Sequence, residues 1–189
     1  MRRGRLLVAL VLLPSLPTGA QIYRGREALY WLTIGLIHEG GHYIAARLCG
    51  FKARIVSPFA TEVNFRSGRY SRDKHRLVLI SGILAEAAVA EALLGKGEEM
   101  SRFEVELTAR IGMSEVGEAV AGFIYPDSDI WRLDELGWDR AIVGPAVAAH
   151  GISVTKRAGR RKRAFREKKF LAGLFPTPGG VGLSFVARF

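Results

Sequence analysis

Residues 27–49 read EALYWLTIGLIHEGGHYIAARLC and set the organisation of the chain. Alanine, leucine and isoleucine dominate this stretch, no proline interrupts it, and Gly50 follows as a stop signal, so it predicts a helix. The helix is apolar on almost every side, which places it in a protein core or in lipid.

After this helix the sequence predicts two short strands, then several helical segments, and finally a hairpin. Residues 52–66 hold β-branched and aromatic residues divided by Pro58, which predicts two short strands. Helical segments are expected at residues 73–94, 98–121 (with a break at Gly112), 130–136 and 141–150 (interrupted at Gly144 and Pro145). Residues 170–175 and 181–189 flank a proline- and glycine-rich turn and predict a hairpin. We therefore expect a mainly α fold with small β elements (α+β).

Length and composition narrow the class of protein. A chain of 189 residues suits one domain. Its 49% hydrophobic content excludes a disordered chain. A single cysteine, Cys49, excludes an internal disulfide framework and a multi-cysteine zinc ribbon.

The net charge of +10 is concentrated at two places in the chain. Residues 1–20 carry +3 and residues 156–169 carry +8, so the remaining residues carry −1. The basic segment 156–169 suits an anionic lipid surface or a solvated linker or helix face. Phe165 is its one aromatic residue, and nucleic-acid binding needs a groove-reading or stacking element, which argues against nucleic acid as a partner.

The first twenty residues resemble a signal peptide. Arginines at positions 2, 3 and 5 precede an apolar stretch at 6–13, and Thr18, Gly19 and Ala20 offer small residues for cleavage. The stretch is too short to cross a bilayer, which takes about 20 residues. We expect export to a bacterial-type cell envelope; the alternative is a short first helix that stays attached as an anchor.

His38, Glu39 and His42 form an H-E-x-x-H motif within the first long helix. Residues four apart lie on one face of a helix, so the two histidines can hold one metal ion together. Glu39 projects beside that ion, where it can act as a general base towards water and then as an acid. Zinc suits this chemistry, because it keeps an open coordination position.

A catalytic zinc site takes three protein ligands, so one more is needed. Asp129 is the favoured third ligand, because it opens a helix whose N-terminus keeps a carboxylate ionised. Asp127 and Glu86 remain alternatives, and Asp127 or Asp129 could instead be an ordinary N-cap. Of the other histidines, His75 lies in a basic, solvated-looking stretch and His150 follows an apolar run typical of a packed histidine.

These residues resemble a known family. Residues 36–47 (LIHEGGHYIAAR), followed by Gly50, resemble the H-E-x-G-H helix of site-2-protease-type (M50) membrane metalloproteases. Residues 81–86 (SGILAE) are similar to that family's second apolar helix, but lack its proline and have Glu86 in place of its asparagine. The family's third zinc ligand is an aspartate in a later helix, which corresponds here to Asp129.

The peptidase domain of the ATP-dependent membrane zinc proteases (M41) is also similar. It has an H-E-x-G-H helix and a later Gly-Gly-x-x-Ala-Glu helix that residues 81–86 resemble, and residues 112–115 (GMSE) are similar to another of its elements. Its aspartate ligand precedes that element, however, and this chain has no aspartate between Asp73 and Asp127. The chain also lacks a G-x-x-x-x-G-K-[ST] loop, so the M50-like interpretation ranks first.

The resemblance implies a zincin-like helical core and hydrolysis of peptide bonds in or near a membrane. His38, His42 and Asp129 would hold Zn²⁺, and Glu39 would be catalytic. The expected organisation is a signal peptide at 1–20, a metalloprotease-like domain at 21–155, a basic segment at 156–169 and a β-hairpin at 170–189. Its partners would be a peptide or membrane-protein substrate, membrane lipid and other envelope proteins. The alternative is a non-catalytic envelope protein that keeps a structural metal site or acts in assembly.

Overall fold

The computed structural model describes residues 18–168, 171–177 and 180–186, with side chains over residues 25–164. The described residues are mainly helical, which confirms the predicted fold class. In chain order the elements are α1 (Thr18–Leu48), β1 (Lys52–Ser57), β2 (Ala60–Asn64), α2 (Arg72–Gly95), a 3₁₀ turn (Gly97–Glu99), α3 (Arg102–Ile124), α4 (Asp129–Glu135), α5 (Arg140–Lys168), β3 (Leu171–Thr177) and β4 (Gly180–Val186). Residues 1–17 of the predicted signal peptide lie outside the described residues, and that prediction stays open.

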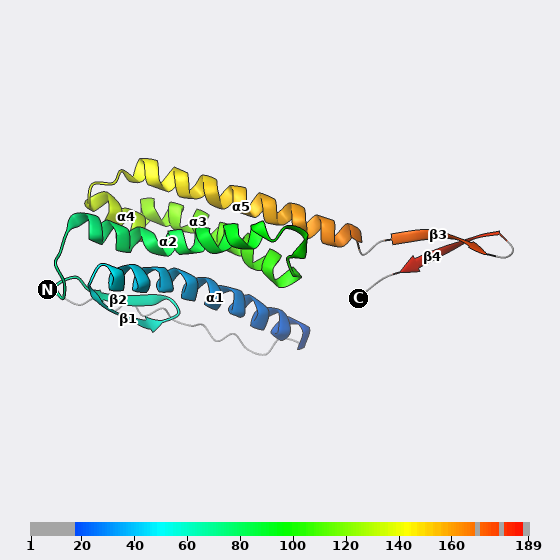
Figure 1. Cartoon of the computed structure of the whole chain (residues 1–189), viewed down its shortest axis with the longest axis horizontal. Helices are drawn as coiled ribbons and strands as arrows, with labels where there is room; N and C mark the ends of the chain where they lie inside the picture. The colour runs from blue at the N-terminus through cyan, green and yellow to red at the C-terminus, as the bar shows by residue number, and fades with distance from the viewer. Residues whose placement is uncertain (1–17, 169–170, 178–179, 187–189) are drawn as a thin grey trace.

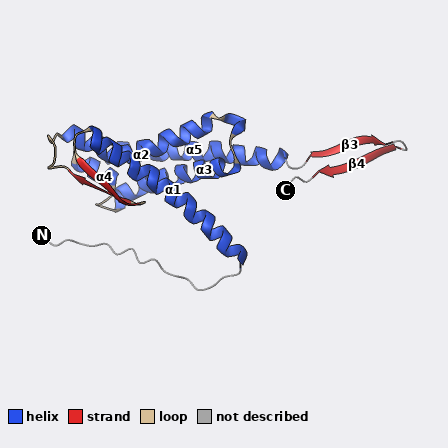
Figure 2. Cartoon of the chain, turned by 60° about the horizontal axis from the view of Figure 1, so that its bottom comes forward, coloured by secondary structure: helices blue, strands red, loops and turns tan. Residues whose placement is uncertain are grey.

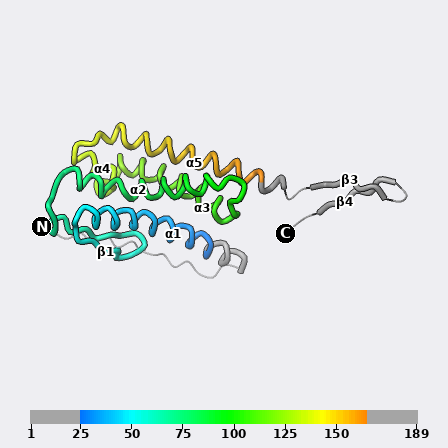
Figure 3. The backbone as a smooth tube through the Cα atoms, viewed as in Figure 1, coloured from blue at the N-terminus to red at the C-terminus, as the bar shows by residue number. Residues whose placement is uncertain are grey.

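Four long helices, α1, α2, α3 and α5, lie side by side, and short α4 sits at one end of them (Figure 1). The path of the chain through this bundle can be followed in Figure 3. In Figure 2 the N-terminal part of α1 diverges from the other helices. The C-terminal half of α1 and the β1–β2 hairpin lie at the same end of the bundle as α4 (Figure 1).

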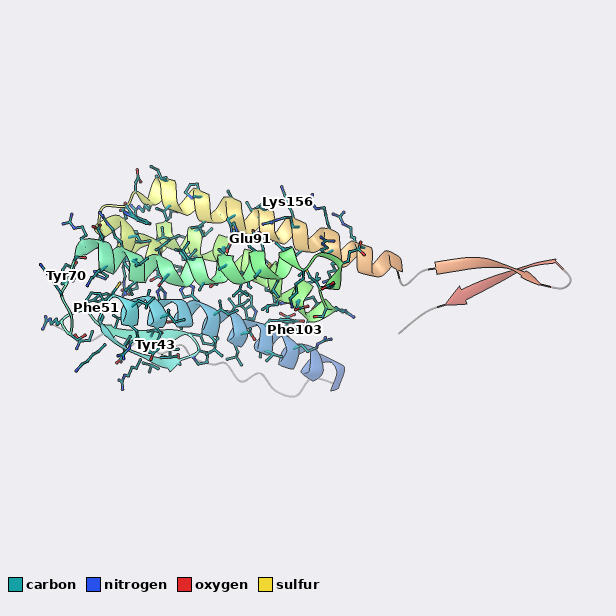
Figure 4. All side chains as sticks on the ribbon, in the orientation of Figure 1. Tyr43, Phe51, Tyr70, Glu91, Phe103 and Lys156 are labelled. Carbon is teal, nitrogen blue, oxygen red and sulfur yellow. The ribbon has the colours of Figure 1, made fainter. Side chains whose placement is uncertain are left out.

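Three groups of buried side chains hold the bundle together. One joins α1, α2, α3 and α5 and consists of Tyr30, Ile34, Ala90, Leu107, Ile111 and Val154. A second surrounds α4 and consists of Leu79, Ile80, Ile83, Ala119, Ile130 and Leu133. A third lies under the hairpin and consists of Ala45, Ala46, Cys49, Phe51 and Val78. Figure 4 labels Phe51 of the third group, near the end of α1. It also labels Phe103 of α3, whose ring stacks on Tyr30 of the first group at a centroid distance of 4.9 Å.

The hairpin of β1 and β2 confirms the prediction of two short strands around Pro58. The strands pair antiparallel from Lys52 opposite Asn64, with an irregularity between Ile55 and Ser57. The turn between them lies on α1 at Gly35, where an added Cβ would be 2.3 Å from the Pro58 carbonyl oxygen. Glycine at this position therefore allows the hairpin to sit close to the helix that carries the H-E-x-x-H motif.

Helix α3 is continuous, so the predicted break at Gly112 is wrong. An added Cβ on Gly112 would lie 2.5 Å from the Gly151 carbonyl oxygen, and one on Gly151 would lie 2.4 Å from the Gly112 carbonyl oxygen. The two glycines thus let α3 and α5 approach backbone to backbone. A helical glycine here serves packing rather than termination.

Helix α5 is also continuous, which corrects the predicted interruption at Gly144 and Pro145. The helix begins at Arg140 with Pro145 inside it, and so early in a helix a proline removes only one backbone hydrogen bond. The predicted boundary between residues 155 and 156 lies inside α5, and Val154 and Ala158 on either side of it are both fully buried. Most of the basic segment is therefore the last part of a packed helix.

The chain ends in the predicted hairpin. β3 and β4 pair antiparallel, from Leu171 opposite Val186 to Thr177 opposite Gly180, and they lie beyond the C-terminal end of α5 (Figure 1). Among the described residues, α2 is the one helix with the length and composition to cross a membrane, a test that buried core helices also pass. In α2, 39% of the apolar stretch is buried within the protein.

Candidate metal centre

The two motif histidines lie one turn apart on α1 and converge on one point. The Nε2 atoms of His38 and His42 are 3.0 Å apart, and the rings meet edge to face with centroids 4.7 Å apart. This is the arrangement expected of residues four apart on a helix. α1 therefore supplies two nitrogen donors to a single site.

Asp129 supplies a third donor from α4. Its Oδ2 lies 3.2 Å from Nε2 of His38 and 2.9 Å from Nε2 of His42. The three donor atoms all lie within 4.8 Å of one another. His38, His42 and Asp129 thus form a group that could hold a metal ion.

The start of α4 explains why Asp129, and not its neighbour, reaches the histidines. Ser128 is the N-cap, and its hydroxyl accepts a hydrogen bond from the backbone N–H of Trp131, so Asp129 is not needed as a cap. Fully buried Ile130 fixes the helix in the core. Asp127 is exposed and pairs with Arg132 at 3.2 Å, so it lies outside the group.

Both histidine rings are oriented through their other nitrogen. Nδ1 of His38 lies 2.8 Å from Oε1 of Glu86, and Nδ1 of His42 lies 2.6 Å from the carbonyl oxygen of Val78. In the neutral ring, an Nδ1–H that donates to these acceptors leaves the Nε2 lone pair for a metal. Glu86, an alternative third ligand from the sequence, therefore stands behind His38 rather than among the three donors.

Gly82 on α2 forms the wall behind the donor atoms. An added Cβ there would lie 2.5 Å from Nε2 of His42 and 2.7 Å from Nε2 of His38. Gly41 has a matching role on α1, where a Cβ would be 2.3 Å from the Ser81 carbonyl oxygen. Glycine on each helix thus brings α1 and α2 together and keeps the space at the donors free.

Hydrogen bonds across the group shift the pKa values of all three residues. Burial lowers the pKa of His38, but its hydrogen bonds to Asp129 and Glu86 outweigh this effect and raise the pKa to about 10. Burial also lowers the pKa of His42, and the bond to Asp129 again gives a net rise. Burial raises the pKa of Asp129, but the two histidines hold it well below its usual range. Without a metal, Asp129 is therefore ionised and His38 is protonated at neutral pH.

Two cavities give access to the group. The larger, of about 730 Å³, is lined by all three donor residues, and a smaller one of about 200 Å³ extends past His38 towards Glu86. Glu39 and Glu118 line both cavities together with His38. Thr61 of the hairpin donates a hydrogen bond to the backbone carbonyl of Glu39 at 3.1 Å, which ties β2 to this part of α1.

The other two histidines of the chain lie elsewhere, as the sequence indicated. His75 packs on Phe65, with ring centroids 3.9 Å apart. His150 lies between Glu115, at 2.7 Å, and Glu91, at 3.1 Å; Glu91 is labelled between α2 and α5 in Figure 4. Neither belongs to the group around His38.

Two features of the site were not predicted from the sequence. The sequence offers Glu86 as an alternative ligand, whereas its place behind His38 depends on how α1 packs against α2. Glu118 carried no sequence signal, because a glutamate on an amphipathic helix is usually a solvated residue. Its position in both cavities follows from the packing of α3 against the site.

Comparison with known proteins gives no relative. The chain matches no protein-family model, no curated protein and no solved structure. The resemblance to the M50 and M41 proteases therefore stays a prediction from short motifs. The group of His38, His42 and Asp129 and the side chains around it are the basis for any assignment of function.

Proposed function

We propose that this protein is a zinc-dependent peptide hydrolase associated with a membrane of the cell envelope. The observation that supports it is the convergence of His38, His42 and Asp129 on one point beside Glu39. An H-E-x-x-H helix with a third ligand from elsewhere in the chain is the arrangement typical of hydrolytic zinc sites.

The donor set favours zinc among the divalent metals. Two imidazole nitrogens and one carboxylate oxygen suit Zn²⁺, and three protein ligands leave one position open. With metal–ligand bonds of 2.0–2.2 Å, tetrahedral ligands lie about 3.3–3.6 Å apart, and here the donors are 2.9–3.2 Å apart. Zinc would therefore fit after the three side chains move apart by a few tenths of an ångström.

Glu39 is the residue proposed to move protons. A bound zinc ion would supply Lewis acidity to oxygen atoms in the larger cavity. The Glu39 carboxylate takes a proton from the attacking water while the water oxygen bonds to the substrate carbonyl carbon. The same proton then passes to the amide nitrogen as the carbon–nitrogen bond breaks, which yields a carboxylic acid and an amine and regenerates Glu39.

The larger cavity favours a peptide with apolar side chains as the substrate. Apolar residues from the hairpin, α2 and α3 line it around the donor group, namely Phe59, Val63, Phe65, Leu79 and Ala121. Ligand sites are typically concave and mostly apolar, with a few placed polar groups. A membrane-protein segment or an apolar peptide fits these walls better than a highly charged substrate does.

The surface supports a membrane location. α1 exposes a series of large apolar side chains, Leu29, Trp31, Leu32, Leu36, Ile44 and Leu48. Monomeric soluble proteins seldom expose extended apolar surface. The basic residues at the end of α5 would be attracted to anionic headgroups at about 1 kcal/mol each. Flotation with vesicles that contain anionic lipid, compared with neutral vesicles, tests this part of the proposal.

The decisive experiment uses the purified full chain loaded with zinc and a mixture of apolar peptides. His38→Ala should lose stoichiometric zinc, measured by elemental analysis, and should lose cleavage. Glu39→Gln should keep zinc and lose cleavage, because the amide cannot accept a proton. A wild-type protein that binds zinc without cleaving any peptide would instead favour a structural metal site or an assembly role.

A further inference from the structure

A cleft between α2 and α5 lies apart from the metal centre and is lined mainly by basic residues. It has a volume of about 520 Å³, and its walls include Glu91 and Gly95 of α2 and Arg157, Arg160, Arg161 and Ala164 of α5. None of these residues lines the two cavities at the metal group. We call it the arginine cleft, and the proposed hydrolase gives it no role.

The spacing of the arginines in the sequence explains why they share the cleft. Residues three and four apart lie on one face of a helix, so positions 157, 160, 161 and 164 of α5 face the same way. Fully buried Ala158, next to this face, packs α5 into the bundle. The small residues Gly95 and Ala164 leave the space between the two helices open. The cleft is therefore a product of helix packing and of one basic helix face.

Arg157 is held at one wall of the cleft by Glu91. Its Nη1 lies 2.9 Å from Oε2 of Glu91, and its Nη2 donates to Oε1. Glu91 also lies 3.1 Å from Nε2 of His150, and Nδ1 of that ring is 2.7 Å from buried Glu115 on α3. These contacts tie α2, α3 and α5 together, so this wall is fixed before any ligand binds.

Arg160 and Arg161 lack the acidic partner that Arg157 has. Arg157 pairs with Glu91, whereas Arg160 and Arg161 have no ion pair among the residues whose side chains the structure describes. Arg161 is partly buried, and its Nη2 would lie 3.9 Å from a Cβ added to Gly97. Two guanidinium groups at the cleft are therefore available to a ligand.

The arginine cleft has an excess of positive charge. Its lining contains three arginines and one glutamate, which gives a net charge of +2. Like charges three or four positions apart on a helix repel each other, and the three arginines have this spacing. The last carbonyls of α2 would repel an anion, but the backbone N–H of Lys96 donates to those of Leu93 and Leu94. An anion bound between the arginines would relieve their repulsion.

We propose that the arginine cleft binds a phosphate group, which Arg160 and Arg161 hold by paired hydrogen bonds beside the fixed Arg157. A phosphomonoester carries about two negative charges at neutral pH, which matches the net charge of the cleft. Planar guanidinium groups bind phosphate oxygens two at a time. A volume of about 520 Å³ suits a small molecule or the polar part of a larger one. The phosphate of a lipid headgroup and that of a soluble phosphate ester share this chemistry.

Two charge-matched variants separate a phosphate site from the general attraction of a basic segment. Arg160→Ala/Arg161→Ala removes two positive charges from the cleft. Lys156→Ala/Arg163→Ala removes two positive charges from exposed positions of the same helix that do not line the cleft, and Lys156 is labelled on α5 in Figure 4. Neither variant alters the buried face of α5 or the metal group, so both should fold.

Calorimetric titration of the full chain with glycerol phosphate tests a soluble ligand. At an ionic strength of about 0.15 M, attraction between distant exposed charges is largely screened. Arg160→Ala/Arg161→Ala should bind about 10- to 100-fold more weakly than wild type, the usual effect of losing hydrogen bonds to a charged group. Lys156→Ala/Arg163→Ala should bind like wild type. Arg160→Lys/Arg161→Lys keeps the charge but loses the paired hydrogen bonds, so its affinity should lie between these values.

Vesicle binding tests a lipid headgroup. Phosphatidylcholine vesicles with phosphatidic acid, which presents a phosphomonoester, are compared with vesicles that carry the same surface charge as phosphatidylserine. If a lipid phosphate occupies the cleft, wild type and Lys156→Ala/Arg163→Ala prefer phosphatidic acid, and Arg160→Ala/Arg161→Ala loses this preference. If only the titration with glycerol phosphate distinguishes the two double variants, the ligand is a soluble phosphate ester. Either result supports the phosphate site and identifies its source.

Two results would overturn the proposal. Equal binding by the two alanine double variants, whether reduced or unchanged, would mean that the cleft has no special part in binding phosphate. A wild type that neither binds glycerol phosphate nor prefers phosphatidic acid would mean that the cleft holds no phosphate group. Zinc content and peptide cleavage enter neither measurement, so the proposed hydrolase is tested separately.

Discussion

The imidazole of His38 has a carboxylate on each of its two nitrogens. Asp129 is 3.2 Å from Nε2 and Glu86 is 2.8 Å from Nδ1. A metal would replace the first contact and leave the second intact. Glu86 is buried, and its other oxygen, Oε2, has no hydrogen-bond partner among the described residues. A carboxyl group with an unsatisfied oxygen is costly to bury. The one contact that Glu86 makes, with Nδ1 of His38, therefore indicates that Glu86 positions the His38 ring.

Glu86 is therefore expected to control zinc affinity without touching the metal. Glu86→Ala should weaken zinc binding by about 10- to 100-fold, the usual effect of removing such a carboxylate. Glu86→Gln should lose less, because its amide oxygen still accepts from Nδ1–H. Competition with a chelator of known affinity measures both values. Equal affinities for Glu86→Ala and wild type would show that His38 is oriented by packing alone.

Zinc affinity should also depend on pH in a defined direction. Because the pKa of His38 is raised to about 10 in the metal-free protein, His38 is protonated at neutral pH and zinc must displace that proton. Raising the pH lowers the cost of this displacement, so zinc should bind about tenfold more tightly per pH unit for each proton released. Chelator competition at three pH values between 6 and 8 checks this. An affinity that does not change with pH would mean that the histidines are neutral before the metal binds.

At the scale of elements, the site depends on how closely α1 approaches α2. The contact is made where the helix backbones carry no side chains, at Gly41 against the Ser81 carbonyl and at Gly82 against the two histidine rings. A helix interior normally disfavours glycine relative to alanine by about 0.5–1 kcal/mol. The two glycines therefore lower the intrinsic stability of their helices, but they allow the helix backbones to approach closely.

The neighbouring glycines of the motif give a matched pair for this contact. An added Cβ on Gly40 meets nothing within 4 Å, whereas one on Gly41 would lie 2.3 Å from the Ser81 carbonyl oxygen. Gly40→Ala should leave the protein as stable as wild type or slightly more stable. Gly41→Ala should cost about 1–3 kcal/mol of unfolding free energy, the usual cost of overpacking, and should weaken zinc binding. Urea unfolding of both variants measures their unfolding free energies. Equal values for the two variants would contradict the predicted contact at Gly41.

At the scale of the whole molecule, the metal group joins parts of the chain that are far apart in sequence. His38 and His42 come from the first helix of the bundle, Asp129 from α4, and the wall residue Gly82 from α2. A metal bound there would link α1 to α4 across the end of the bundle shown in Figure 1. A metal that binds the folded state and binds the unfolded chain poorly would stabilise the fold.

Removal of zinc should therefore lower the stability of the entire bundle. At a free zinc concentration of 100 times Kd, the gain in unfolding free energy is about 2.7 kcal/mol. Thermal unfolding of the full chain with zinc, and again after chelation, should show a lower Tm without metal. The His38→Ala variant is the control, and its Tm should respond to neither treatment. A wild-type Tm that does not change on chelation would indicate that zinc does not bind this group.

The sequence alone determined the features that depend on local rules. A proline-free apolar stretch, the stop at Gly50 and the strands around Pro58 are readable because helix and strand propensities act over a few residues. The pairing of His38 with His42 follows from the helical repeat. Glycine and proline predict helix breaks from local rules, and this prediction is wrong at Gly112 and Pro145. Packing of α3 on α5 keeps both helices continuous there.

Only the tertiary structure decided which distant side chains share the site. The sequence favours Asp129 as the third donor and leaves Asp127 and Glu86 as alternatives. The choice among the three depends on the N-cap of Ser128 and the anchoring of Ile130 in the core. The places of Glu86 behind His38 and of Glu118 in both cavities are likewise set by helix packing. The physical reason is that contacts between residues far apart in the chain are fixed by close packing of whole helices, for which a single sequence carries no local signal.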